Sequence, residues 1–263
     1  MRVWVDSAGI LGPGLPGWEV SRPVLAGKSP CPGGELVLPK LELLPPVERR
    51  RTGLLVKLVL AAGQDALPQS RPAIAYLPAV FASSGGDGDV VNEICTTLAG
   101  TDRQVSPTRF HNSVHNAPAG YWSIATGSRA PSTSLSAFDW SFAAGLVEAA
   151  SQIVCERDYV LLVAADIPYP QPLLGVRKTR LPFGGALLLA RERGAQSLGA
   201  LDIDVSERAE QTRMPDPLLE QLREDNPSAR GLPVFAALAG AKTATVALDY
   251  VAGKSLRVAA TPC

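Results

Sequence analysis

The chain has 263 residues; 46 % of them are hydrophobic and 19 % are charged, and 25 basic side chains balance 25 acidic ones. A chain of this length and apolar content can bury the core of one large domain or of two small ones. The zero net charge argues against nucleic acid or an anionic membrane as a partner, because both attract basic proteins. The apolar runs fall short of the ~20 residues that a membrane span needs.

Taken in chain order, hydrophobic periodicity predicts alternating strands and helices. We expect strands at 3–5, 73–83, 158–165, 184–191, 201–205, 243–250 and 256–260, and helices at 48–67, 90–98, 138–154 and 218–225, with a loop and a short helix over 107–127. Pro78 places the second strand at a sheet edge or a bend, because proline donates no ladder hydrogen bond. This order predicts one layered α/β domain with a mixed sheet, undivided by a linker.

The four cysteines (Cys31, Cys95, Cys155 and Cys263) form no Cys-x-x-Cys pair. Their spacing fits neither a zinc site nor a disulfide framework, so we expect reduced thiols and neither metal nor cofactor. The amino terminus lacks the apolar stretch of a signal peptide. These features predict a cytoplasmic protein.

The glycine-rich run at 12–17 matches the Gly-x-Gly-x-x-Gly spacing of dinucleotide-binding loops. Prolines fill two of its variable positions and we expect no amphipathic helix behind it, although such a loop needs a helix N-terminus to hold the pyrophosphate. We therefore interpret the run as a structural turn. A Gly-x-Ser-x-Gly nucleophile elbow is absent from the sequence.

His111 and His115 are the only histidines, and their spacing would place both on one face of a helix, as in some zinc enzymes. Asn112 stands where such a motif carries its glutamate base, and no third ligand is evident. We interpret the pair as polar residues near a helix start rather than as a metal site.

Three stretches, in order and with matching spacing, resemble the N-terminal half of a β-ketoacyl synthase of the thiolase-like fold. They are VWVDSAGILGPG at 3–14 with LAGKS at 25–29, APSTSLSAFDWS at 130–141, and LPFGGALLLA at 181–190. The runs FHNSVHN at 110–116 and GYW at 120–122 are similar to the short ketosynthase-like proteins of aryl polyene and xanthomonadin pathways. The resemblance implies a layered α/β/α domain over 1–263, ketosynthase-like over 1–194 and divergent over 195–263, where the last part completes the sheet of a truncated ketosynthase.

The resemblance places the family's nucleophilic cysteine at Asp139, at the start of the helix 138–154. A helix N-terminus lowers the pKa of a thiol and holds the thiolate, so a condensing enzyme needs its cysteine there. No cysteine lies within fifteen residues of this position, and no histidine follows His115, although the family uses two histidines from its C-terminal half. The match therefore implies a non-catalytic subunit, a pseudoenzyme.

Family members without the nucleophile are chain length factors, which pair with a full-length β-ketoacyl synthase and shape its acyl tunnel. The resemblance implies such a heterodimer in polyene or fatty-acid-type biosynthesis, with acyl carrier protein as a further partner. Candidates to line the tunnel or the interface are Phe138, Trp140, Phe142, His111, His115, Tyr121 and Trp122. The alternative is that these are ordinary core and interface side chains.

Two further hypotheses remain open at this stage. Asp139 with His111 or His115 would form an acyl-thioester decarboxylase or hydrolase, or the chain would be a stand-alone module that binds acyl chains or carrier proteins. A run of three arginines, Arg49, Arg50 and Arg51, is either a solvated first helical turn or a docking patch for an acidic carrier protein.

Overall fold

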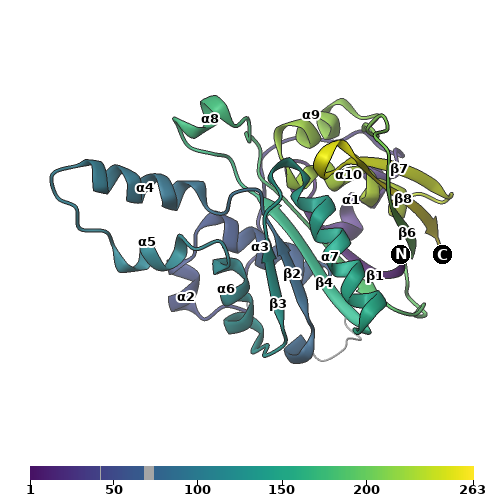
Figure 1. The fold of residues 1–263 in the computed structure, drawn as a ribbon, viewed down its shortest axis with the longest axis horizontal. Coiled ribbons are helices and arrows are strands. Elements are labelled where there is room, and N and C mark those ends of the chain that lie inside the picture. The colour runs from purple at the N-terminus through teal and green to yellow at the C-terminus, as the bar shows by residue number, and fades with distance from the viewer. Residues whose placement is uncertain (42, 68–73) are drawn as a thin grey trace.

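The computed structural model describes residues 1–41, 43–67 and 74–263. In these ranges eight strands form one sheet in the order β3-β2-β4-β5-β1-β6-β8-β7. The strands are β1 (Arg2–Leu11), β2 (Ala79–Ala82), β3 (Ser132–Leu135), β4 (Tyr159–Asp166), β5 (Phe183–Ala190), β6 (Gly199–Ser206), β7 (Ala244–Asp249) and β8 (Ser255–Pro262). Helices cover both faces of the sheet (Figure 1), so the predicted layered α/β/α class with a mixed sheet is confirmed.

The helices follow the same chain order. They are α1 (Trp18–Leu25), α2 (Pro46–Arg51), α3 (Leu54–Asp65), α4 (Gly88–Ala99), α5 (Pro107–Asn112), α6 (Ala117–Thr126), α7 (Ser141–Cys155), α8 (Leu173–Val176), α9 (Pro217–Asp225) and α10 (Leu232–Ala239). Short 3-10 turns are η1 (Ile74–Tyr76), η2 (Phe138–Trp140), η3 (Ser228–Gly231) and η4 (Val251–Gly253). None of the described helices is long and apolar enough to cross a bilayer.

The sheet is parallel at one edge and antiparallel elsewhere. β2 pairs in parallel with β3 and β4, whereas the neighbours from β4 through β7 all run antiparallel. Every residue of β5 is buried and only Tyr159 of β4 is not. Strands buried on both faces read as continuous apolar runs, which is why these two were predictable from the sequence.

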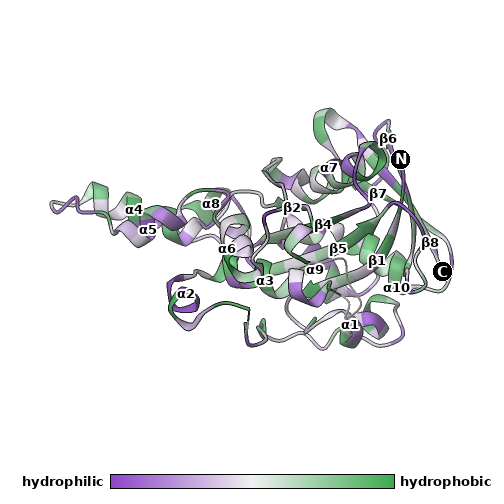
Figure 2. Ribbon diagram, turned by 90° about the horizontal axis from the view of Figure 1, so that it is seen from below, coloured by the Kyte–Doolittle hydropathy of each residue, from purple (hydrophilic) through white to green (hydrophobic). Residues whose placement is uncertain are grey.

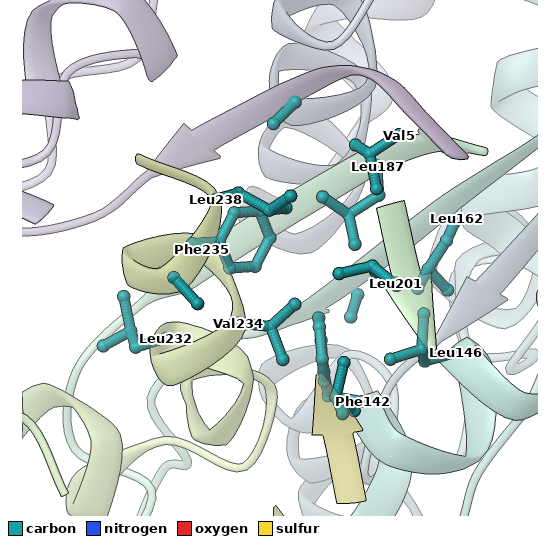
Figure 3. Packing of buried hydrophobic residues seen from close by; sticks show 14 of the residues in the cluster. Val5, Phe142, Leu146, Leu162, Leu187, Leu201, Leu232, Val234, Phe235 and Leu238 are labelled. Atoms are coloured by element: carbon teal, nitrogen blue, oxygen red, sulfur yellow. The ribbon is translucent and has the colours of Figure 1, made fainter. Parts of the chain in front are cut away.

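Two hydrophobic cores fill the space between the sheet and its helices. On one face Phe142 of α7 and Phe235 of α10 pack with ring centroids 5.8 Å apart, in one cluster with strand residues such as Leu162 and Leu187 (Figure 3). On the other face α3 covers β4 and β5, α6 packs against α3, and Trp122 of α6 lies in that core. Coloured by hydropathy, the strands of the body are largely apolar, while α4 and α5 project away from it as an arm (Figure 2).

The prediction of one continuous helix over 48–67 is wrong, because the chain breaks into α2 and α3. Thr52 is extended between them, with φ −81° and ψ 137°. A side chain at Gly53 would collide with the Asp87 carboxylate, so this glycine permits the close approach of the loop before α4. The apolar stripe expected from the sequence lies on α3, where Leu58, Val59 and their neighbours are buried.

The strand expected at 73–83 is shorter than predicted and is not an edge strand. Residue 73 lies outside the described residues, 74–76 form η1, and β2 lies between β3 and β4. Pro78 is tolerated because it precedes the first ladder residue, Ala79, and its carbonyl accepts the N–H of Leu161 at 2.9 Å. A proline just outside a strand therefore carries no information about the sheet edge.

The expectation that no helix follows the glycine-rich run is also wrong, since α1 begins at Trp18. A side chain of the protein itself nevertheless binds the N–H group at the start of this helix. The Asp65 carboxylate accepts the N–H groups of Trp18 at 2.7 Å and of Ile10 at 2.9 Å. This internal carboxylate takes the position that a pyrophosphate would need, so the structural interpretation of the run stands.

Candidate functional site

The candidate site lies where the edge strand β3 passes into α7. Between them Phe138 has a φ of 54°, in the left-handed region that non-glycine residues rarely adopt. The turn is fixed by Ser141, whose Oγ donates to the Phe138 carbonyl at 2.8 Å and accepts the Ala137 N–H at 3.0 Å. Such strain costs about 1–3 kcal/mol and persists only where surrounding contacts impose it.

Asp139, the predicted nucleophile position, is held between two arginines. Arg177 Nη1 donates to one carboxylate oxygen at 2.8 Å, and Arg230 Nη2 donates to the other at 3.1 Å. The three side chains retain only 27 %, 17 % and 27 % of their exposure, in the order Asp139, Arg177 and Arg230. Both carboxylate oxygens are thereby engaged by charge-assisted hydrogen bonds, which is a structural pairing rather than the arrangement of a free nucleophile.

The aromatic residues of η2 complete this corner. The Arg177 guanidinium lies 3.6 Å from the ring centroid of Phe138, which is 54 % exposed. The Trp140 indole N–H donates to Asp249 of β7 at 3.1 Å. Together Phe138, Asp139, Arg177 and Arg230 line a small cavity of about 210 Å³.

A second carboxylate, Asp166 at the end of β4, is fully buried close to this corner. It accepts five hydrogen bonds, from Ser83 Oγ, from the N–H and Oγ of Ser84, and from the N–H and Oγ of Ser228. Burial raises the pKa of Asp166, and the hydrogen bonds from Ser228 and Ser84 oppose that rise. The network ties the loop after β2, the end of β4 and η3 together.

The other predicted tunnel or interface residues lie in different environments. Phe142, Tyr121 and Trp122 are each at most 3 % exposed and belong to the two cores. His111 is exposed on α5, with its ring edge-on to Tyr121, and the ring Nε2 of His115 lies 3.1 Å from the Ser83 carbonyl oxygen. The contacts found for the described residues therefore join Asp139 to arginines and do not join it to either histidine.

The three arginines at 49–51 lie on α2, which is far in the sequence from β3 and α7. Arg50 and Arg51 are exposed, Arg51 pairs with Glu48 at 3.5 Å, and Arg49 donates to the Leu44 carbonyl at 3.1 Å. Among residues 1–41, 43–67 and 74–263, no cluster of three or more His, Cys, Asp or Glu side chains is arranged to hold a metal ion.

Sequence reasoning missed the three residues that organise this corner: Arg177, Arg230 and Asp166. The role of Asp166 could have been predicted, because a carboxylate at the end of a fully buried strand needs hydrogen-bond donors from within the protein. The roles of Arg177 and Arg230 could not have been predicted from local sequence, since these residues are 38 and 91 positions from Asp139 along the chain.

The mixed sheet covered on both faces, with a strained turn leading into a buried helix, defines a thiolase-like layered domain. The family model for the β-ketoacyl synthase N-terminal domain matches residues 27–249. The chain therefore belongs to the β-ketoacyl synthase family. No curated protein sequence matches it.

Several solved structures share its fold over nearly its whole length. A chain from the complex of the ketosynthase ApeO with its chain length factor ApeC, from Xenorhabdus doucetiae, superposes with a TM-score of 0.74 at 24 % identity, covering 98 % of this chain and 99 % of that one. A chain of the ishigamide ketosynthase/chain length factor gives 0.73 at 13 % identity over 99 % of both chains. A chain of the type II polyketide complex AntDE:AntF, a ketosynthase with its acyl carrier protein, gives 0.78 at 13 % identity, covering 100 % of this chain and 99 % of that one.

Proposed function

We propose that this chain is a chain-length-factor-type subunit that pairs with an active β-ketoacyl synthase and shapes its acyl tunnel. One observation carries the proposal. The chain has a ketosynthase frame in which the turn η2, directly before helix α7, carries a doubly paired Asp139 and no cysteine. Without a thiolate at this helix N-terminus, the chain cannot take up an acyl group by the family's chemistry.

The cysteines elsewhere in the chain offer no substitute. Cys155 is the last residue of α7, where the helix dipole disfavours a thiolate. Cys31 is buried, and this burial raises the pKa of its thiol. Cys95 and Cys263 lie on α4 and at the carboxyl end of the chain, neither of which is the start of α7. The sequence also supplies no histidine after His115 to assist decarboxylation.

The solved structures support a paired subunit of this size. Two of the similar chains come from complexes of a ketosynthase with a chain length factor, and each is covered to 99 % of its length. The third comes from a complex that contains an acyl carrier protein. We infer that acyl carrier protein is the source of substrate for the heterodimer, that Arg49–Arg51 are candidates for its docking, and that the complex works in the cytoplasm on polyene or fatty-acid-type chains.

The exposed ring of Phe138 is the strongest candidate among the aromatic residues for lining the partner's tunnel. It is 54 % exposed, whereas Phe142, Tyr121 and Trp122 are buried in this chain's own cores. A bulky ring that faces a partner would set product length by steric exclusion. Phe138→Ala is then expected to lengthen the product of the heterodimer, which mass spectrometry of the carrier-bound chain measures.

Co-expression with a full-length ketosynthase from the same organism tests the proposal. We expect both chains to co-purify in equal amounts. We also expect the complex to condense malonyl-carrier substrate, and we expect no condensation from this chain alone or from its Asp139→Ala variant alone. The proposal is overturned if the two chains never associate. It is also overturned if this chain alone turns over acyl-carrier substrate and loses that activity in Asp139→Ala but not in the surface control Asp204→Ala, which would establish the decarboxylase or hydrolase alternative.

A further inference from the structure

The ring of Phe138 needs a fixed position to act as a steric stop, and its own turn does not provide one. The two hydrogen bonds of Ser141 hold backbone atoms, the Phe138 carbonyl and the Ala137 N–H. The Phe138 side chain itself is exposed, and the tilted Trp140 ring lies 6.4 Å away between centroids. An exposed side chain samples several rotamers unless a neighbour restrains it. The restraint on this ring therefore comes from another segment.

Arg177, in the segment after α8, provides that restraint. Its guanidinium carbon lies 3.6 Å from the centroid of the Phe138 ring, well inside the ~6 Å range of a cation–π contact. Arg177 Nη2 has no hydrogen-bond acceptor among the described residues, and an aromatic face is a weak acceptor for such an N–H group. The Arg177 side chain is only 17 % exposed, so the contact is partly shielded from water and stronger than one on an open surface.

The backbone that carries Arg177 is itself held in place. The Arg177 carbonyl accepts the Thr179 N–H at 2.9 Å, and the carbonyl of the buried Thr179 accepts the Tyr169 N–H at 3.0 Å. The Tyr169 hydroxyl lies 2.9 Å from Ser84 Oγ, which donates to the buried Asp166. The arginine therefore extends from a segment that is fixed to the core of the domain.

Asp139 fixes the orientation of the Arg177 guanidinium. One carboxylate oxygen accepts Arg177 Nη1 at 2.8 Å, and the other accepts Arg230 Nη2 at 3.1 Å. Arg230 belongs to η3, whose Ser228 donates to the buried Asp166. A guanidinium group is planar, so a carboxylate at its edge and a ring against its face restrain it in two directions.

We propose that Asp139 and Arg177 are positioning residues that hold the Phe138 ring in one place and thereby fix the length at which the partner's acyl chain stops. The inference rests on the proposed function and deepens it, because it gives a role to the carboxylate at the position predicted for the nucleophile. Without this pair the ring rotates about its side-chain torsions, and the stop becomes imprecise rather than absent.

The distribution of product lengths from the heterodimer tests the proposal. Mass spectrometry of the carrier-bound chains gives the ratio of longer products to the main product. We expect Arg177→Gln to raise this ratio about fivefold, which corresponds to the loss of one cation–π contact. Phe138→Ala should instead move the main product to greater length. In the Phe138→Ala background, Arg177→Gln should have no further effect, because no ring remains to be held.

Two further variants separate positioning from general effects of charge or stability. Arg193→Gln is the matched control, because it also removes a guanidinium from an aromatic face, that of Trp4 on β1 at 5.7 Å, and it should give the wild-type distribution. Arg177→Lys keeps a positive charge beside Asp139 but lacks the planar group against the ring, so it should broaden the distribution as Arg177→Gln does. Circular dichroism checks folding, and Arg177→Lys replaces Arg177→Gln if the latter fails to fold.

Proton NMR of this chain alone examines the contact in the absence of a partner. The ring current of Phe138 should shift the side-chain methylene signals of Arg177 upfield, and Phe138→Leu should return them to the ordinary arginine range. The signals are assigned by their loss in Arg177→Lys. Arg177 signals that do not respond to Phe138→Leu overturn the proposal.

The product distributions also distinguish this inference from the subunit assignment. The inference is overturned by an unchanged distribution in Arg177→Gln, by a wild-type distribution in Arg177→Lys, or by an equal effect of Arg193→Gln. It is also overturned if the effect of Arg177→Gln persists in Phe138→Ala. In each of these cases an active heterodimer still supports the subunit assignment, whereas failure of the two chains to associate overturns both.

Discussion

Two aspartates at the ends of strands in one sheet are stabilised in opposite ways. Asp166 ends β4, is 1 % exposed and is held by the hydroxyl and amide donors of three serines. Asp139 follows β3, keeps 27 % of its side-chain exposure and is held by two guanidinium groups. Neutral hydroxyl and amide donors can stabilise a fully buried carboxylate, because they satisfy its oxygens by hydrogen bonds. A carboxylate at the mouth of a cavity can instead form ion pairs with long, partly hydrated arginine side chains. The first fixes the fold, and the second stands at the position that the sequence resemblance predicts for the family's nucleophile.

The largest expected effect comes from breaking the buried network. Asp166→Ala leaves the serine donors of two segments, the loop after β2 and η3, without an acceptor. We therefore expect a loss of about 3–5 kcal/mol in the free energy of unfolding. Urea denaturation followed by circular dichroism measures it. The exposed control Asp204→Ala should change stability by no more than about 0.5 kcal/mol. A loss below about 1 kcal/mol for Asp166→Ala would show that the network is dispensable.

Breaking the half-exposed pair should cost less. Asp139→Ala removes two charge-assisted hydrogen bonds and leaves Arg177 facing Arg230, and we expect a loss of about 1–2 kcal/mol because water partly replaces the carboxylate. A double-mutant cycle of Asp139→Asn with Arg230→Gln isolates the pair, with an expected coupling of at least ~0.5 kcal/mol. Additive single effects would mean that the pair contributes nothing beyond its separate side chains.

The strained turn at Phe138 predicts a smaller change in stability, whose direction differs from that at an ordinary helix position. Because Phe138 has a positive φ, Phe138→Gly should be more stable than Phe138→Ala by about 1 kcal/mol. The control position is the exposed Gln221 of α9, where the alanine variant should be the more stable one by a similar ~1 kcal/mol. Thermal unfolding of the four variants ranks them, and the same order at both positions would argue against strain at Phe138.

The smallest effect concerns another acid–arginine pair, Glu220 with Arg223 on α9. Their 2.7 Å contact lowers the pKa of Glu220 below its usual range. Since the folded-state pKa lies below the unfolded one, the pair stabilises the fold at neutral pH, and this contribution is lost as the pH falls through the folded-state value. We expect Glu220→Gln to remove that part of the acid sensitivity, which lies below the usual pKa range of a glutamate. Unfolding curves at neutral and acid pH check the sign, and an unchanged pH dependence in Glu220→Gln would contradict it.

The sequence predicted the elements whose signal is local. β4 and β5 are continuous apolar runs, and Asp216, directly before α9, caps its first turn. All three elements lie within a residue or two of their predicted bounds. α10 was missed, because a helix buried on nearly every side shows no polar face to set a period. The break before α3 was missed because its cause, the approach of Asp87 to Gly53, comes from another part of the chain.

The sequence by itself determined the family frame and the absence of a cysteine at the start of α7, because both are properties of residue order and identity. Only the tertiary structure decided what surrounds that position. Arg177 and Arg230 meet Asp139 because the folded sheet and the packing of η3 against η2 bring together segments that are distant in the chain. Local periodicity reports which face of an element is buried, but a carboxylate's partners depend on which segments the sheet order places beside it.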